Sequence, residues 1–329
     1  MTAPEEIVDI LQLINSDNLG PVTFYKLLEK FGSVQAAIAN IGSLKKVCLW
    51  PREKAVAVFE NAGRQKIELI TFNDERYPQL LRGLNDAPPL LFVRGNCELL
   101  NFSAGISVVG ARNASINGRK TASRIAYDLT NQGIMVVSGM ARGIDAAAHK
   151  GALYAQNQSG ATIAVLGTGV DVPYPDENSG LYEQIEEQGC IISEFLPGTL
   201  PQANNFPRRN RIVAALTQGT LVVEATAQSG SLITAQLAAD YGRELFAIPG
   251  SPTEPRSIGP NRLIKNGAHL VETAEDITKV LHNISINPVP RRKPQKQKEF
   301  AFAEPEVPGN APARTQTKII DYLNADGVY

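Results

Sequence analysis

The sequence predicts an α/β protein built on one doubly wound, mostly parallel sheet. Two short apolar runs, residues 106–109 and 134–137, each end in a glycine-containing turn that leads into a helical pattern. This is the order of elements in a parallel α/β sheet. Further strand candidates alternate with helical patterns at residues 162–166, 191–192, 220–224, 245–248 and 269–271. The repeated alternation favours a large sheet with helices on both faces.

Residues 1–66 are predicted to form a small all-α domain. Apolar residues recur there at helical spacing, and Gly20-Pro21 and Gly32-Ser33 each supply a helix stop followed by a helix start. The turn at residues 18–21 resembles a helix-hairpin-helix, in which turn amides hold a nucleic-acid phosphate. Two helices that simply pack together would show the same pattern, so both interpretations stay open.

Residues 67–284 are predicted to form the main domain. Pro88 and Pro89 forbid a continuous helix near its beginning, and the apolar run 90–93 is a candidate strand that enters the sheet. The segment before this strand is interpreted as a lead-in without a site. Helices are expected at residues 211–217, 232–241 and 274–281, the last opened by a capping box of Thr273 and Asp276.

The C-terminal part is predicted to begin as a linker. Residues 285–314 are rich in proline and charge and show no periodicity, which is typical of a flexible tether. Contact of its basic half with a polyanion is the less favoured alternative. Residues 315–329 begin a helical pattern. Because one helix cannot bury its apolar face, we expect this segment to be the truncated start of a further small domain.

The composition bounds the class of protein. The 329 residues carry a net charge of −1, so a polyanion could bind only through a local basic patch. Three widely spaced cysteines indicate neither a disulfide framework nor a zinc site, and no cofactor is expected. The sequence shows no signal peptide and no membrane-spanning run of ~18 apolar residues. We expect a soluble protein of the reducing cytoplasm, without a membrane partner.

The first glycine-containing turn, residues 110–115, offers residues suited to a phosphate. Gly110 allows a close backbone approach, and Arg112 offers a bidentate fork. The turn lacks the G-x-G-x-x-G pattern of a dinucleotide site and the acidic residue expected about 20 positions later, which disfavours NAD. A plain helix cap with a surface arginine is the alternative interpretation.

The second turn, residues 138–143, repeats this arrangement with more glycine. Two glycines allow a backbone nest that binds an anion, and the candidate residues are Ser138, Gly139, Arg142 and Gly143. Loops at the carboxyl ends of parallel strands line one edge of the sheet, so Arg112 and Arg142 should lie across from each other. The sequence therefore predicts an anion-binding edge.

Three further places in the sequence carry polar residues whose role the sequence leaves open. Asp145 and His149 lie four residues apart on the helix after the second turn. With no third ligand visible, a structural hydrogen bond that holds the imidazole is favoured over a metal pair or an acid–base couple. The turn at residues 167–171 with Tyr174 either adds amides to the same edge or only turns the chain. Glu224 ends a strand without a paired acid or a nucleophile, so a structural or ligand-hydroxyl contact is favoured over catalysis.

The most basic short run, residues 205–211, combines one aromatic residue with three arginines. Its candidate binding residues are Phe206, Arg208, Arg209, Asn210 and Arg211. Arginine for phosphate and phenylalanine for base stacking is the combination used on single strands, where stacking contributes about 1–3 kcal/mol per base. A solvated basic helix start is the alternative, but arginines there oppose the helix dipole, a cost that an anionic ligand relieves. The run therefore indicates nucleic-acid binding.

Taken together, these motifs resemble those of the DprA/Smf family, the DNA-processing proteins of bacterial transformation. The matching motifs are G-A-R-N-A-S, S-G-M-A-R-G-I-D-A-A-A-H, G-T-G-V-D-V-P-Y-P, N-F-P-R-R-N-R-I-V-A, V-V-E-A, S-G-S-L-I-T-A and G-P-N-R-L-I-K-N-G-A. They occur in the right order between about residues 77 and 271, and the lead-in Y-P-Q-L-L-R-G-L-N-D-A-P-P-L-L-F-V-R-G belongs to the same pattern. As a set they are highly specific.

The resemblance implies an extended Rossmann-like fold that binds and protects single-stranded DNA in a positively charged pocket. It also implies a homodimer that is not an enzyme and that loads RecA recombinase onto strands in natural transformation or homologous recombination. The implied DNA-binding positions are Gly110, Arg112, Ser138, Gly139, Arg142, Gly143, Phe206, Arg208, Arg209, Asn210 and Arg211. The family often carries a helical N-terminal domain and a C-terminal winged helix, of which residues 315–329 would be the start.

A nucleotide-processing enzyme is the main rival interpretation. The fold also resembles phosphoribohydrolases of the lysine-decarboxylase-like group, whose P-G-G-x-G-T-x-x-E signature supplies a catalytic glutamate. Here the run G-T-L-V-V-E places Glu224 differently, which disfavours hydrolysis. A purely structural interaction module is a third interpretation, and it would show neither DNA binding nor turnover.

Overall fold

The chain begins with a module of four helices. The computed structural model describes residues 4–41, 47–155 and 162–286. The four helices are α1 (Pro4–Ile14), α2 (Pro21–Phe31), α3 (Val34–Asn40) and α4 (Arg52–Arg64). Gly32 ends α2 with a φ of +83°, which favours glycine, and Ser33 caps α3 by accepting a hydrogen bond from the amide of Ala36 at 3.1 Å. The stop and start signals of the sequence thus act as predicted.

Nine strands of the described residues form one sheet, in the order β1-β2-β6-β5-β4-β3-β7-β8-β9. They are β1 (Glu68–Thr71), β2 (Leu90–Gly95), β3 (Gly105–Val109), β4 (Met135–Ser138), β5 (Thr162–Val165), β6 (Cys190–Ser193), β7 (Gly219–Val222), β8 (Glu244–Ala247) and β9 (His269–Leu270). Only the pairs β1–β2 and β2–β6 are antiparallel. The predicted, mostly parallel sheet is confirmed. The four-residue strand β1 was not expected, because it begins with an exposed glutamate and is too short to show a pattern.

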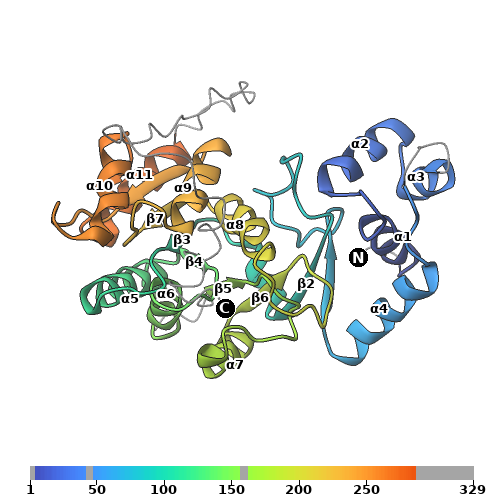
Figure 1. Cartoon of the computed structure of the whole chain (residues 1–329), viewed down its shortest axis with the longest axis horizontal. Helices are drawn as coiled ribbons and strands as arrows, with labels where there is room; N and C mark the ends of the chain where they lie inside the picture. The colour runs from blue at the N-terminus through green and yellow to red at the C-terminus, as the bar shows by residue number, and fades with distance from the viewer. Residues whose placement is uncertain (1–3, 42–46, 156–161, 287–329) are drawn as a thin grey trace, which may run out of the picture. The chain divides into compact units, whose positions relative to one another are not determined.

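Helices cover both faces of this sheet. They are α5 (Ile116–Asn131), α6 (Ile144–Leu153), α7 (Ser179–Gln188), α8 (Asn205–Leu216), α9 (Gly230–Asp240), α10 (Ile258–Lys265) and α11 (Ala274–Ile286). Val108 of β3 lies in one apolar cluster with residues of α5, α6 and α11, whereas the next residue, Val109, lies in another with residues of α8 and α9. Figure 1 shows α5, α6 and α7 below the strands and α8 and α9 above them. The doubly wound arrangement is therefore confirmed.

The winding of the sheet reverses between β3 and β7. The chain runs outward from β3 through β4 and β5 to β6, returns along α8 to β7 beside β3, and then runs outward through β8 to β9. In open α/β sheets, ligands bind in the crevice at the carboxyl ends of the strands on either side of such a reversal. The loops that follow β3, β4, β5, β6 and β7 form this carboxyl edge.

Two helices extend well beyond their predicted bounds. Helix α8 begins at Asn205 instead of residue 211, so the arginine run lies within the helix. Helix α11 reaches Ile286, two residues into the predicted linker. The rest of the linker, up to residue 314, and the predicted helix at residues 315–329 lie outside the described residues.

The predicted cap of α11 is present. The carboxylate of Asp276 accepts hydrogen bonds from the backbone amides of Glu272 and Thr273, both at 3.0 Å. These contacts satisfy amides that the first turn of a helix leaves without an intrahelical partner. Asp276 therefore fixes where this last described helix begins.

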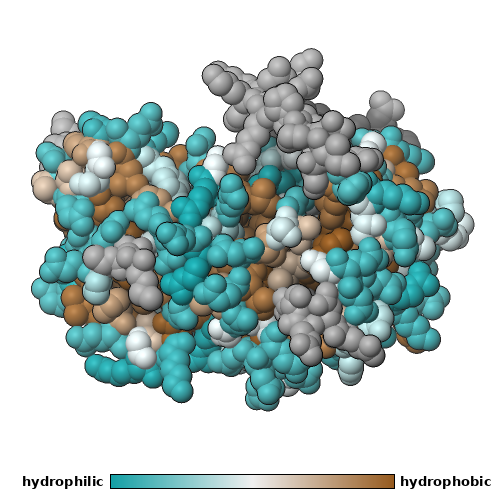
Figure 2. All heavy atoms as spheres, turned by 180° about the vertical axis from the view of Figure 1, so that it is seen from behind, coloured by the Kyte–Doolittle hydropathy of each residue, from teal (hydrophilic) through white to brown (hydrophobic). Residues whose placement is uncertain are grey.

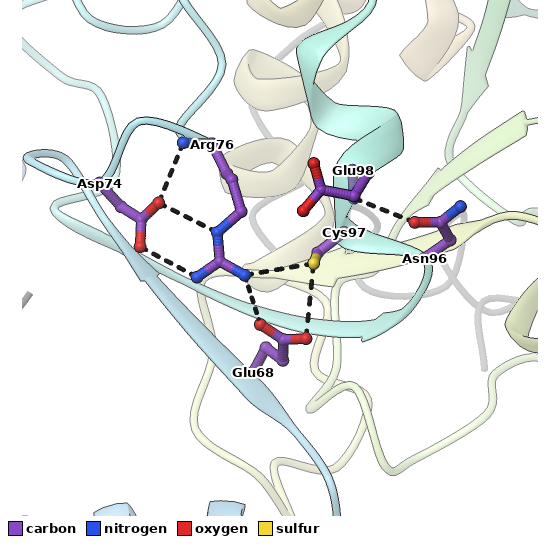
Figure 3. Close-up of polar contacts among 6 residues, drawn as sticks. All are labelled: Glu68, Asp74, Arg76, Asn96, Cys97 and Glu98. Carbon is purple, nitrogen blue, oxygen red and sulfur yellow. Dashed lines mark hydrogen bonds and ion pairs between the residues drawn. The ribbon is translucent and has the colours of Figure 1, made fainter. Parts of the chain in front are cut away.

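Arg76 ties the lead-in segment to the edge of the sheet. Its guanidinium donates to Asp74 at 3.0 and 3.1 Å, to Glu68 of β1 at 2.6 Å and to the Cys97 thiol at 3.3 Å. Figure 3 shows this fork between the two carboxylates and the sulfur. Cys97 begins the short helix η2 (Cys97–Asn101), and burial raises the pKa of its thiol. The cluster thus has a structural role, because a protonated, buried thiol is a poor nucleophile.

One face of the molecule carries both hydrophilic and apolar side chains. In the view from behind, hydrophilic side chains cover much of this face, and apolar residues gather near its centre and at the left (Figure 2). Single exposed apolar residues are normal in folded proteins. No helix among the described residues is both long enough and apolar enough to cross a lipid bilayer.

His149 is part of the core. It is fully buried on α6, and its Nδ1 lies 2.8 Å from the hydroxyl of Thr162, which itself donates to the carbonyl of Val136 at 2.7 Å. The hydroxyl therefore accepts a hydrogen bond from Nδ1–H, which fixes the neutral tautomer. Burial lowers the pKa of His149 to about 3. The hydrogen bond to Thr162 confirms the prediction that His149 has a structural role.

The buried histidine should make stability depend on pH. An unfolded histidine takes up a proton near pH 6.5, whereas native His149 stays neutral down to about pH 3, so lowering the pH should favour unfolding. By pH 5 the free energy of unfolding should fall by about 2 kcal/mol from this group alone. In urea titrations at a series of pH values, His149→Gln should lose this part of the slope. A variant with the full wild-type slope would contradict a neutral buried imidazole.

Candidate nucleic-acid interface

The loops after β3 and β4 lie directly against each other at the carboxyl edge. Gly143 has a φ of +77°, and a Cβ added there would lie 2.2 Å from the carbonyl oxygen of Ala111. The amide of Ile144 donates to that same oxygen at 3.3 Å. Only glycine fits this close approach. The contact brings the loops that carry Arg112 and Arg142 together, as the sequence predicted, and both arginines are exposed.

Phe206 lies where three segments of the edge meet. The guanidinium of Arg112 lies 5.5 Å from the centre of the Phe206 ring, within the range of a cation–π contact. The ring of Tyr174, from the loop after β5, lies 5.6 Å from it at an interplanar angle of 35°. Gly167 lets the ring in, since a Cβ there would lie 2.9 Å from Phe206. We call Arg112, Tyr174 and Phe206 the Arg112–Phe206 site.

Tyr174 is the member of this site that sequence reasoning did not single out. Its glycine turn was expected only to supply amides or to reverse the chain. Two aromatic residues that follow different strands of a parallel sheet are brought to one edge by the topology. This was the signal in the sequence that could have paired Tyr174 with Phe206.

Arg142 and Arg208 flank the site as exposed cations. Arg142 lies 3.5 Å from Glu177 of the short helix η3 (Asp176–Asn178), and both side chains are about half exposed, at 49% and 62%. Such a pair contributes little to stability. Arg208 is 57% exposed, lies over the ring of Phe195 at 5.0 Å, and stays 3.8 Å from Glu194. Both guanidiniums remain open to an incoming anion.

Glu224 fills the start of α5. Its carboxylate accepts hydrogen bonds from the amide of Ser115, at 2.8 Å, and from the Ser115 hydroxyl. A Cβ at Gly118 would lie 2.4 Å from the same carboxyl group. Helix starts of this kind bind the phosphate in nucleotide-binding α/β folds. Here the chain supplies its own anion, so Glu224 makes the structural contact that the sequence favoured.

The arginine run does not form one continuous basic patch, which corrects the sequence prediction. Since the run lies inside α8, helical periodicity directs its members to different sides. Arg211 pairs with Glu194 and donates to the carbonyl of Asp86, and its side chain is only 14% exposed. Arg209 is 4% exposed. Direct contact of Arg209 with a strand is therefore contradicted, and Arg211 is already engaged. Asn210, half-buried, stays a prediction.

Arg209 forms the floor beneath the loops. Its Nη1 donates to the carbonyl of Val165 at 2.6 Å, and burial lowers its pKa to about 10, so it stays charged at neutral pH. Asp145, also buried, accepts from the amides of Gly139 at 3.1 Å and Ala141 at 3.4 Å. Burial raises the pKa of Asp145, while the charge of Arg209 opposes this rise. Asp145 thus holds the turn after β4 through its amides, and the guanidinium of Arg209 packs against Gly139 of the same turn.

Ser138 and Gly139 serve this floor instead of facing solvent, which corrects their prediction as DNA contacts. Ser138 is fully buried and donates its hydroxyl proton to the carbonyl of Val108 at 2.6 Å. A Cβ at Gly139 would lie 1.9 Å from the guanidinium of Arg209. Gly110 and Gly143, half-buried, keep the loops in close contact, and their backbone contacts with DNA stay predictions.

The edge shows no set of residues for metal chemistry. Across the part of the chain that the structure describes, no three histidine, cysteine, aspartate or glutamate side chains come together as a metal site. Asp145 and His149 take separate partners, the turn amides and Thr162. What the edge offers is cations, two aromatic rings and tightly packed loops.

The close fit of Gly139 against Arg209 should make this glycine necessary. Gly139→Ala should lower the free energy of unfolding by about 1–3 kcal/mol, because a methyl group cannot enter without moving the guanidinium or the loop. Gly180→Ala on α7 is the matched control, since nothing lies within 4 Å of its added Cβ. Urea denaturation measures both. Equal midpoints for the two variants would contradict the proposed packing.

Comparison with known proteins agrees with these features. The family profile of DNA recombination-mediator protein A matches residues 68–282, and that of a DprA-like N-terminal HHH domain matches residues 4–47. The chain is 45% identical over 213 residues to the DNA processing protein DprA of Streptococcus pneumoniae, covering 65% of this chain and 74% of that protein. It is 44% identical over 210 residues to the protein Smf of Escherichia coli, covering 64% and 55% of the two chains.

Two solved structures are similar over most of the fold. The crystal structure of DprA from Streptococcus pneumoniae matches with a TM-score of 0.71 and 36% identity, over 84% of this chain and 98% of that one. A structure of DNA processing protein A from Helicobacter pylori matches with a TM-score of 0.60 and 28% identity, over 66% and 96%. The latter was reported for the single-stranded DNA binding mode of that protein. On the matched profiles, relatives and structures together, the chain belongs to the DprA/Smf family of DNA-processing proteins.

Proposed function

We propose that the Arg112–Phe206 site binds single-stranded DNA. The observation that carries this proposal is the placement of an exposed guanidinium 5.5 Å from a partly exposed aromatic ring at the carboxyl edge. Among the described residues, the guanidinium of Arg112 lies over this ring and makes no ion pair within 4.0 Å. Binding by the Helicobacter pylori relative supports the proposal.

The proposed mechanism separates the two parts of a nucleotide. The guanidinium of Arg112 binds a backbone phosphate, and the ring of Phe206 stacks on a base, supported from behind by Tyr174. Arg142 and Arg208 attract the neighbouring phosphates. Since every base has a π-face, recognition is tolerant of sequence. Since phosphate neutralisation releases counterions, affinity falls as salt rises, with a slope of about −0.7 for each phosphate contact on a single strand.

Because the chain belongs to this family, we also propose a role beyond DNA binding. The chain would protect incoming strands, act as a homodimer in the cytoplasm, and pass strands to RecA recombinase. The match to the profile of a recombination mediator supports this role. A strand-exchange assay with purified RecA and a single-strand-binding protein would test it, with faster RecA loading as the expected result.

We propose that the carboxyl edge binds DNA without catalysing a reaction, and the contacts of Glu224 support this. Glu224, the glutamate considered for catalysis at a strand end, is engaged here, because it accepts two hydrogen bonds from Ser115. A side chain held in this way is not free to act on a nucleotide. The rival activity predicts release of free base from nucleoside monophosphates, and a colorimetric assay for the base should find none.

Substitutions in the Arg112–Phe206 site should weaken the binding of single-stranded DNA. Arg112→Ala should weaken binding of an oligothymidine about tenfold and reduce the salt slope by about 0.7, since one charged phosphate contact is lost. Phe206→Ala should cost about 1–3 kcal/mol of binding free energy, while Phe206→Tyr should retain most of it. Fluorescence anisotropy across a salt series measures these effects.

Lys150→Ala is the control for charge. Lys150 is exposed near the C-terminal end of α6, away from the helix end that faces the site, so its removal should leave affinity unchanged. Thermal unfolding should show that Arg112→Ala is folded. A folded Arg112→Ala, Phe206→Ala double variant with wild-type affinity would refute the site.

A further inference from the structure

Two arginines that no part of the proposed site uses anchor themselves to the loop that carries Arg112. Arg119, on the second turn of α5, donates to the carbonyl of Ala114 at 2.7 Å. Arg256, from the short helix η4 (Pro255–Ser257), donates its Nε–H to the carbonyl of Asn113 at 2.8 Å. Two successive carbonyls of one loop thus hold two guanidiniums that come from different elements.

The position of Arg256 is fixed by the backbone as well. The amide of Ala225, next to Glu224, donates to the carbonyl of Arg256 at 2.7 Å, and the amide of Gly259 donates to the carbonyl of Ala225 at 2.9 Å. The segment after β8 is therefore tied to the end of β7. Because Glu224 is bound to Ser115 in turn, Arg256 and the loop at residues 110–115 belong to one interlocked edge.

The charges of these two arginines differ in how they are balanced. Within the described residues, the guanidinium of Arg119 faces a carbonyl and no carboxylate, and the residue is exposed. Arg256 pairs with Glu254 at 2.9 Å, and the two side chains are 38% and 44% exposed. Such an exposed pair is weak and can open for a stronger anion. Ile116, 64% exposed, lies between Arg112 and Arg119 in the chain and adds apolar surface.

Side chains offer an anion several donors near this helix start. The amide and hydroxyl of Ser115 are already bound to Glu224, so they are not open to a phosphate. Guanidinium donors near this helix start belong to Arg112, Arg119 and Arg256. A guanidinium that uses one N–H on a carbonyl keeps others for a phosphate oxygen.

We propose that Arg119 and Arg256 form a second phosphate subsite, which holds the backbone of a single strand beyond the nucleotide bound at the Arg112–Phe206 site. This inference rests on the proposed function and deepens it. The strand would pass over the outside of residues 112–119, with a sugar or base against Ile116. Glu254 would act as an internal competitor that leaves Arg256 when the phosphate arrives.

Strand length provides the first test. The double variant Arg119→Gln, Arg256→Gln should bind a strand of about 16 nucleotides more weakly, whereas a strand of about 4 nucleotides, held at the Arg112–Phe206 site, should bind as to the wild type. For the long strand, affinity should fall about fivefold for each arginine and the salt slope by about 0.7 for each phosphate. Anisotropy with labelled oligothymidines measures both quantities. Equal loss for the two lengths, or no loss for either, would overturn the subsite.

Removing the competitor provides a test of opposite sign. Glu254→Gln should tighten binding of the long strand about fivefold, because Arg256 is then free. Adding Arg256→Gln to this variant should abolish the gain. A damaged fold cannot produce tighter binding, so this result would not arise from instability. An unchanged or weaker affinity in Glu254→Gln would count against the proposed role of Arg256.

The outcomes separate this inference from the function on which it rests. If the wild type binds no single strand, both proposals fail together. If the wild type binds and Arg112→Ala weakens binding at both lengths, the function holds, and the long-strand effects of the Arg119, Arg256 and Glu254 variants then decide the subsite. Lys150→Ala again serves as the charge control, with no change expected for either strand.

Discussion

The hydrogen bonds between Glu224 and Ser115 constrain everything else at the carboxyl edge. The strand reversal between β3 and β7 creates the crevice in which this kind of sheet usually binds a phosphate, and the start of α5 opens onto it. The chain closes that position with its own carboxylate. We therefore propose that an external anion binds further out, mainly on guanidiniums. This arrangement suits an extended polyanion that crosses the edge better than a mononucleotide that enters it.

Buried charge beneath the edge keeps this outer surface in place. Arg209 and Asp145 lie under the turn after β4, where Arg209 reaches the end of β5 and Asp145 holds two turn amides. Removing either buried polar group would leave its backbone partners unsatisfied, which costs stability. Because α8 carries both Phe206 at the surface and Arg209 in the floor, the stacking ring and the loops share one rigid support. A strand would thus meet a prearranged site.

The sheet and the exposed part of the site could be predicted from the sequence, but the phase of α8 was missed. Apolar runs alternating with helical patterns indicate the sheet, and strand ends place Arg112 and Arg142 on one edge. For the basic run, charge alone does not say which arginine points inward. Arg209 stands three residues before Ile212 and seven before Leu216, both buried, so helical spacing would have placed it on the inner face. The closing contact of Glu224 depends on two loops far apart in the chain, which no local pattern reveals.

We propose that the carboxyl edge binds single strands through guanidiniums and an exposed ring. The most direct test is fluorescence anisotropy of a labelled oligothymidine and of its duplex counterpart, titrated with the wild-type chain across a salt series. We expect tighter binding of the single strand, because only unpaired bases can stack on Phe206, and a logarithmic salt slope of about −0.7 for each phosphate held. Absent binding, a preference for the duplex, or an affinity that does not change with salt would contradict it.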